Sequence, residues 1–402
     1  MKTPRNQSLA VTCVLLVLAL TQSYCTATPR APEGEVAIGR PQTLAIAFEV
    51  ASRIPANPHA RDRARMQGLV VEACIELGML DAATTYARSI SDWRRGEALA
   101  LIAQCHAASG TRAQAEALLE TALLVAAGER DWRRERIRVA IAKAELALGN
   151  ETRALELTGG MSPAELGRIE VARTEFVDAA KFDERAELFD RAIATKNFDL
   201  ARSAIDGYLV MLGRITNDDA RSTRAKSSIE AAIVGLPLDL QVIDTVQLAR
   251  VLFARQQKDA AEAALAHACD LFAKTTFLAE DLAPLGVVIA RAHLALGHRE
   301  AAEGELRHLR AQCESRQREI VDVRRARSFR DLAEAFEEVG DHASAMRCYA
   351  QALDAGSVNP NARPRAEDLC ATCVSMARAG VAPTPALVRR IDSIRTSLVD
   401  PW

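Results

Sequence analysis

The chain has 402 residues, of which 49% are hydrophobic and only 4% are aromatic. Its 51 basic and 53 acidic residues give a formal charge of -2 and are interspersed, so there is no positive field of the kind that holds a nucleic-acid backbone. Ala, Leu, Arg and Glu dominate, and no alternating β-branched run is sustained. This composition indicates an all-α protein.

The N-terminal segment, residues 1–27, has the layout of a secretory signal peptide. Basic residues precede an apolar run over Leu9–Leu20, and the small residues Cys25 and Ala27 stand at the -3 and -1 positions of a cleavage site. The run is shorter than the roughly 20 residues that span a bilayer. We expect cleavage and export, with an uncleaved anchor or lipidation at Cys25 as the alternatives. Residues 28–40 carry Pro, Gly and charge without periodicity, which predicts a disordered lead-in.

A short phrase then recurs along the chain: an aliphatic, a small and a polar residue, with a glycine six residues after the polar one. It reads Val70-Val71-Glu72, Ile102-Ala103-Gln104, Ile141-Ala142-Lys143, Ile289-Ala290-Arg291 and Leu332-Ala333-Glu334. Leu248-Ala249-Arg250 also fits, with Gln256 at the glycine position. Repetition of this kind predicts a stack of small units, none of which can bury its apolar face alone.

The residues after each glycine define the second half of a unit. Small or apolar residues follow at spacings of five, then four, then three, as at Ala83, Ala87 and Ile90 after Gly78. These spacings place one apolar stripe on a second helix, directly after a turn in which glycine is left-handed. Each unit is therefore predicted to be a helical hairpin.

Two of the units are nearly duplicates, offset by 39 residues, and both carry a tryptophan between hairpins. We expect Trp93 and Trp132 to pack between neighbouring hairpins, and the alternative is a pair of exposed aromatic anchors. Residues 162–240 are helical in pattern but match the phrase poorly. The last unit is a candidate cap, because its outer helix carries Arg389, Arg390 and Arg395.

This register resembles the tetratricopeptide repeat family, whose units have an aliphatic and a small residue in the first helix, a glycine turn, and an alanine-rich second helix. The resemblance covers roughly residues 60–400 and implies a right-handed α-solenoid of about eight or nine helix-turn-helix repeats. It also implies a concave groove that binds protein or peptide. We divide the mature chain into N-terminal repeats at 41–161, degenerate helical repeats at 162–240, and C-terminal repeats with a cap at 241–402.

The polar residue of the phrase is the candidate site. The residues are Glu72, Gln104, Lys143, Arg250, Arg291 and Glu334. Because each follows the packed small residue, we expect them to line one face of successive first helices. In the resembled family this position often contacts bound peptide, so these six residues are expected to bind a polar or charged peptide. The alternative is a solvated face without a ligand.

No pattern typical of catalysis stands out. Cys370 and Cys373 form a C-x-x-C, but Cys373 falls at the small-residue position of the repeat, so packing is the favoured interpretation over redox chemistry or zinc. His293 and His298 are five apart, without the H-E-x-x-H arrangement of zinc hydrolases. Neither a phosphate-binding loop nor a nucleophile elbow occurs. We expect no catalytic residue, no cofactor and no metal.

The sequence therefore predicts an exported, non-catalytic scaffold whose partner is a protein or peptide. It predicts no nucleic-acid partner, and membrane contact only through the N-terminal segment if that segment is retained. The excess of Arg over Lys favours a bacterial origin, hence a periplasmic or secreted protein. Two alternatives stay open: a membrane-tethered envelope assembly factor, and an enzyme with a site in the atypical region at 162–240.

Overall fold

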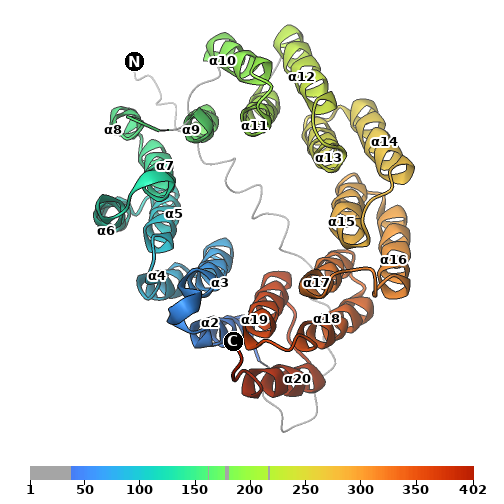
Figure 1. Cartoon of the computed structure of the whole chain (residues 1–402). Coiled ribbons are helices and arrows are strands. Elements are labelled where there is room, and N and C mark those ends of the chain that lie inside the picture. Colours follow the sequence, from blue (N-terminus) through green and yellow to red (C-terminus); the bar gives the residue numbers. More distant parts are fainter. Residues whose placement is uncertain (1–37, 162, 177–180, 216–217) are drawn as a thin grey trace, which may run out of the picture. The chain divides into compact units, whose positions relative to one another are not determined.

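The computed structural model describes residues 38–161, 163–176, 181–215 and 218–402, all within one compact unit. These residues form helices and no strand (Figure 1), which confirms the all-α prediction. The earlier helices are α2 (Arg40–Arg53), α3 (Ala56–Glu76), α4 (Leu80–Arg88), α5 (Arg94–Ala108), α6 (Arg112–Gly128), α7 (Asp131–Ala147), α8 (Glu151–Glu156), α9 (Pro163–Phe176), α10 (Phe182–Ala194) and α11 (Phe198–Arg214). The later helices are α12 (Asp219–Val234), α13 (Leu238–Ala254), α14 (Lys258–Lys274), α15 (Ala279–Ala295), α16 (Arg299–Ser315), α17 (Asp322–Glu338), α18 (His342–Ser357), α19 (Ala362–Ala379) and α20 (Pro385–Thr396).

The proposed signal peptide at 1–27 lies outside the described residues, and so does most of the lead-in at 28–40. The final lead-in residue, Arg40, begins α2. Among the described residues, no helix combines the length and the apolar character needed to cross a membrane.

The predicted turns occur where the recurring glycines fall. The five glycines of the phrase have φ values between 71° and 92°: Gly78, Gly110, Gly149, Gly297 and Gly340. This left-handed conformation has no steric cost for glycine. Gln256 adopts it as well, with φ of 62°, although a side chain there costs roughly 1–2 kcal/mol. The phrase therefore marks the end of each first helix, even where glycine is replaced.

The apolar stripe of the second helices is buried, as predicted. The small residues five positions after each turn are all 0% exposed: Ala83, Ala115, Ala154, Ala261, Ala302 and Ala345. One second helix is shorter than its spacing predicts, because α8 ends at Glu156, before Met161. Gly159 and Gly160 lie between them, and each glycine costs about 1 kcal/mol in a helix interior.

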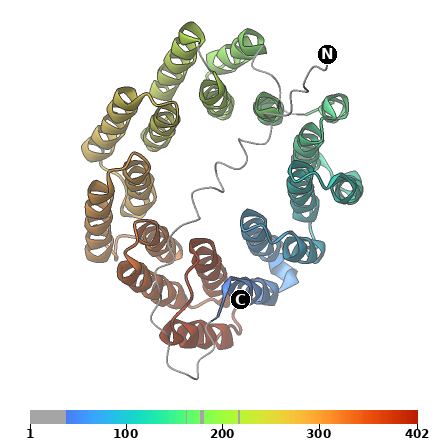
Figure 2. The same cartoon turned by 180° about the vertical axis from the view of Figure 1, so that it is seen from behind.

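The odd-numbered helices contact one another in sequence. Contacts run from α3 through α5, α7, α9, α11, α13, α15 and α17 to α19, and α19 packs on α3 and on α2 (Figures 1 and 2). We call the helices α3 to α19 with odd numbers the odd-numbered circuit. Most even-numbered helices pack on the odd-numbered helix that precedes them, as α4 does on α3 and α6 on α5.

The contacts of α19 with α2 and α3 bring together the two ends of the described chain. The guanidinium of Arg378 pairs with both carboxylate oxygens of Glu76, at 2.6 and 2.9 Å, and Arg395 lies 3.1 Å from Glu49. The C-terminal hairpin therefore contacts the N-terminal helices through Arg378 and Arg395, while Arg390 of its outer helix is exposed and pairs with Asp354 of α18 at 3.2 Å. That this hairpin is a cap stays a prediction.

The atypical region contains a repeat hairpin that the glycine pattern does not reveal. Lys196 takes the glycine position between α10 and α11, with φ of 56°. Ala201, Ile205 and Tyr208 follow at the usual spacings, and all three are buried. In this hairpin α10 packs on α11, which is the member of the odd-numbered circuit. The circuit helix is thus the second helix here, whereas it is the first helix in the units that carry the phrase.

In that hairpin, a large side chain on α10 packs against a glycine on α11. Phe189 stands at the first-helix position that is small in other units, and a Cβ atom on Gly207 of α11 would overlap its ring. The phenol of Tyr208 donates a hydrogen bond to the carbonyl of Ala186 at 3.0 Å, and its ring meets Phe189 edge to face. A large residue on one helix is matched by the smallest on the other, as close packing requires.

Candidate functional site

Each residue of the candidate site lies on a different helix of the odd-numbered circuit. Glu72, Gln104 and Lys143 lie on α3, α5 and α7, and Arg250, Arg291 and Glu334 lie on α13, α15 and α17. The first three helices contact one another in series, and so do the last three. We call these six positions, each six residues before the turn, the ladder. Whether the ladder binds peptide stays a prediction.

The ladder divides into residues that pair with each other and residues that do not. The guanidinium of Arg291 binds the carboxylate of Glu338 at 2.6 to 2.9 Å and that of Glu334 at 3.2 Å. Arg291 and Glu334 share a register position on neighbouring helices, so their opposite charges meet. The other four, Glu72, Gln104, Lys143 and Arg250, make no hydrogen bond or ion pair with other described residues. The ladder charges on α15 and α17 are thus paired within the protein, and the unpaired polar groups of the ladder lie on α3, α5, α7 and α13.

A cavity of about 230 Å³ lies beside the first ladder residue. Arg65 and Glu72 of α3, Glu97 and Leu101 of α5, Arg136 of α7, and Trp93 just before α5 are among its lining residues. Glu72 is exposed, yet the surrounding protein partly desolvates its carboxylate and raises its pKa, an effect that Arg378 opposes and Glu97 strengthens. The cavity therefore holds a carboxylate that is accessible, partly desolvated and without a cation in contact.

Sequence reasoning missed Arg65, Glu97 and Arg136, although a signal for them exists. Glu97 and Arg136 are 39 residues apart, which is the offset between the two nearly duplicated units. Their side chains pair at 2.8 Å. Opposite charges at one register position of consecutive units are therefore a usable sign of contact between neighbouring first helices.

The two tryptophans contact each other, but only Trp93, which lines this cavity, is buried. Trp93 is 8% exposed, while Trp132 is 55% exposed, and their rings meet edge to face at 5.2 Å. Trp93 packs between hairpins as predicted, whereas that prediction is wrong for Trp132. Helix α7 begins at Asp131, directly before Trp132, so this side chain lies in the first turn of the helix, where it contacts Trp93 and stays largely exposed.

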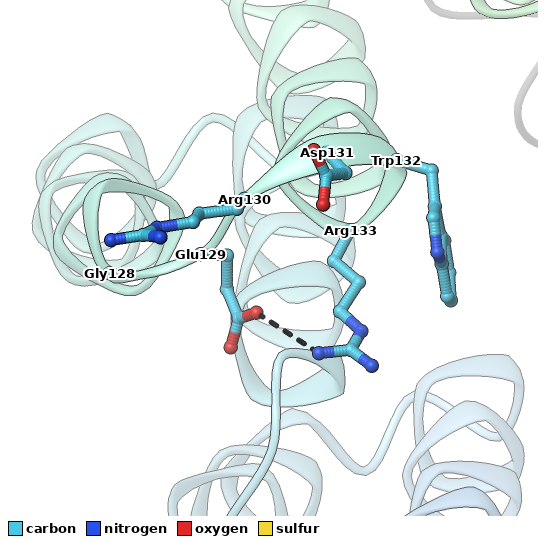
Figure 3. Close-up of a pocket in the computed structure, with 6 residues that line it drawn as sticks. All are labelled: Gly128, Glu129, Arg130, Asp131, Trp132 and Arg133. Carbon is cyan, nitrogen blue, oxygen red and sulfur yellow. Dashed lines mark ion pairs between the residues drawn. The ribbon is translucent and has the colours of Figure 1, made fainter.

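A second cavity, of about 350 Å³, lies at the turn from α6 to α7 and is lined by residues 128–133 (Figure 3). Glu129 and Arg133 approach to 4.0 Å across it, and Arg130 extends to the side opposite Trp132 (Figure 3). The guanidinium of Arg133 lies 5.6 Å from the ring centroid of Trp132. This cavity is a shallow polar feature of one turn, and its charged groups are solvated.

Titratable groups converge where α11 meets α13. Asp244 is 1% exposed, and its carboxylate lies 3.6 Å from Arg202, too far for a hydrogen bond. Burial raises the pKa of Asp244 to about 6, with Arg202 opposing and Asp206 adding to the effect. Neither oxygen of Asp244 has a hydrogen-bond partner among the described residues. The Asp244 carboxylate is buried, whereas Arg202 beside it is partly exposed and Asp206 is exposed. An enzyme with a site in this region stays a hypothesis.

The two cysteines of the C-x-x-C are packed in the core, and the two histidines lie on either side of a helix turn. Cys370 and Cys373 are both fully buried, and Cys370 donates weakly to the carbonyl of Met66 on α3 at 3.9 Å. Burial raises the pKa of Cys373 to about 12. His293 and His298 lie nearer than a single-helix spacing suggests, with ring centroids 5.8 Å apart, because the Gly297 turn intervenes. Within the described ranges, no three His, Cys, Asp or Glu side chains are grouped to hold a metal ion.

Comparison with known proteins adds little to this picture. No protein-family model matches the sequence, and no curated protein matches it either. Among solved structures, the chain is similar to the crystal structure of Ton1535 from Thermococcus onnurineus NA1, with 13% sequence identity and a TM-score of 0.31. The match covers 82% of this chain and 94% of that one. A likeness at this score carries no argument about function, which therefore has to be inferred from the contacts within the chain.

Proposed function

We propose that this protein is a non-catalytic scaffold of tetratricopeptide type, built as a right-handed solenoid, that binds a protein or peptide segment along the odd-numbered helices. One observation carries the proposal: residues of one register position lie on successive contacting helices, and four of them have polar groups without a described partner. Polar groups arranged in a row can match the side chains of an extended segment, and such complementarity supplies specificity.

We also propose that the protein is exported and acts in the periplasm or outside the cell. The support is the composition of residues 1–27. The mass of the protein isolated from its native source tests this: cleavage after Ala27 leaves a chain that begins at Thr28. A mass that includes residues 1–27 contradicts cleavage and favours the membrane-tethered alternative.

The binding proposal is tested by reversing unpaired ladder charges. Lys143→Glu and Arg250→Glu together leave the internal pairs of Arg291 intact, since neither residue takes part in them. We expect the wild-type protein, used as bait on envelope extract and culture medium, to retain a protein that the double variant loses. Circular dichroism checks that the helices of the variant are preserved.

The matched control reverses one lysine and one arginine on even-numbered helices. Arg88→Glu on α4 and Lys258→Glu on α14 change the net charge by the same amount, and both residues are exposed. We expect this control to retain the partner. Retention by both double variants, or loss by both, contradicts a role for the ladder, and the absence of any retained protein contradicts the scaffold function itself.

A further inference from the structure

The cavity beside Glu72 lies among rows of residues that share a register position on neighbouring helices. The row seven residues before the ladder consists of Glu367 on α19, Arg65 on α3, Glu97 on α5 and Arg136 on α7. Its charges alternate, and they pair: Arg65 with Glu367 at 2.9 Å, and Arg136 with Glu97 at 2.8 Å. Charges in this row are therefore satisfied within the protein.

The row four residues after the ladder behaves in the same way next to Glu72. Glu76 on α3 forms a bidentate pair with Arg378 on α19. At the cavity's other side, Arg94 pairs with Asp92 at 2.6 Å. Each charged group that lines or borders the cavity thus has an opposite charge in contact, with Glu72 as the exception among the described residues.

The reason that Glu72 lacks a partner is the identity of its two neighbours in the ladder. The equivalent position on α5 is Gln104, which is neutral, and the equivalent position on α19 is Val374, which is apolar and 1% exposed. Arg291 and Glu334 show what happens when the neighbour has the opposite charge, since they pair at 3.2 Å. Glu72 is therefore the charged lining residue without an opposite charge in contact among the described residues, whereas the three arginines that line the cavity, Arg65, Arg94 and Arg136, are each paired with a carboxylate.

The walls and size of the cavity limit what that carboxylate can receive. Ile75 and Leu101 supply partly exposed apolar surface. Trp93 supplies part of an indole ring, over which the Arg94 guanidinium lies 4.7 Å from the ring centroid. The volume of about 230 Å³ is below the roughly 300–1,000 Å³ of pockets that hold drug-sized ligands. A long side chain with an apolar stem and a cationic end matches an apolar wall, an aromatic ring and a carboxylate.

We infer that the cavity between α3, α5 and α7 binds a lysine or arginine side chain of the bound segment, with Glu72 as its counter-ion. The inference rests on the proposed peptide-binding function and specifies the chemistry of one position of the peptide. The apolar stem lies against the partly exposed Ile75 and Leu101, and the cationic end reaches the Glu72 carboxylate, which is the contact that selects for basic residues.

The test is selection of peptides from a displayed library of random twelve-residue sequences against the purified protein. We expect the enriched peptides to share one Lys or Arg, and replacement of that residue by alanine to weaken binding about tenfold in a fluorescence-anisotropy titration. Glu72→Gln keeps the shape of the side chain and is expected to cause a similar loss. Glu72→Lys is expected to enrich peptides with Asp or Glu instead.

The control is Glu120→Gln on α6, an exposed carboxylate on an even-numbered helix, which is expected to leave the affinity unchanged. Enriched peptides without a shared basic residue, or with affinity indifferent to Glu72→Gln, overturn the inference but leave the scaffold function standing. If no peptide is enriched at all, the proposed function fails, and this inference fails with it.

Discussion

The contact of α2 with α19 can be tested by removing one buried side chain. Leu44 of α2 is 0% exposed and belongs to the same apolar cluster as Leu369 and Val374 of α19. Truncation of a buried leucine to alanine costs about 2–5 kcal/mol, since transfer free energy is lost and a cavity remains. The ion pairs nearby, which join α3 to α19 and α2 to α20, are partly exposed, and such pairs contribute only about 0.2–1 kcal/mol each. Leu44→Ala should therefore weaken the contact more than 0.5 M NaCl does.

Hydrogen exchange of backbone amides measures the effect helix by helix. A loss of 2 kcal/mol in opening free energy corresponds to exchange roughly 30-fold faster. We expect faster exchange in α2 and also in α19, although more than 300 residues separate these helices along the chain. Leu124→Ala is the matched control, because Leu124 on α6 is 75% exposed. Faster exchange in α2 and α3 with no change in α19 would show that α19 does not pack there.

Three further predictions concern stability and reactivity. Burial raises the pKa of Asp244 to about 6, above the roughly 3.9 of an unfolded chain, so the folded state loses stability as pH rises from about 4 to 6. Asp244→Asn should therefore stabilise the protein by up to about 3 kcal/mol at pH 8 and by little at pH 3.5, as measured by urea unfolding. Equal effects at both pH values contradict this. Gly297→Ala should destabilise the protein by about 1–2 kcal/mol, because the φ of Gly297 is 92°. Gly304→Ala in the interior of α16 should stabilise it by about 0.4–1 kcal/mol in the same assay, because a Cβ atom there meets no other atom of the described chain. Equal signs for the two changes contradict this reasoning. Iodoacetamide should modify the partly exposed Cys105 before the buried Cys370 in the native protein, and mass spectrometry that finds Cys370 modified first refutes its packing role.

Local sequence determined the helices, their turns and the buried stripes. The left-handed turns at the five recurring glycines, and the one at Gln256, depend on spacing alone, because each turn is decided within a few residues. The same is true of the small residues that face the neighbouring helix, since a helix has a fixed period. Even the hairpin with Lys196 at its turn has the expected spacing of Ala201, Ile205 and Tyr208, although the missing glycine concealed it.

Tertiary structure decided which residues of the ladder are free of partners within the described chain and so available to bind another molecule. Sequence gives Glu72 and Arg291 the same position in their units, yet Arg291 is neutralised by Glu334 and Glu338, while Glu72 has Gln104 and Val374 as neighbours. The Val374 neighbour exists only because α19 packs on α3, a contact between residues some 300 positions apart. Local periodicity fixes the face of each helix on which a side chain lies. The partner across that face depends on which helices meet, and this is decided by packing of the whole chain.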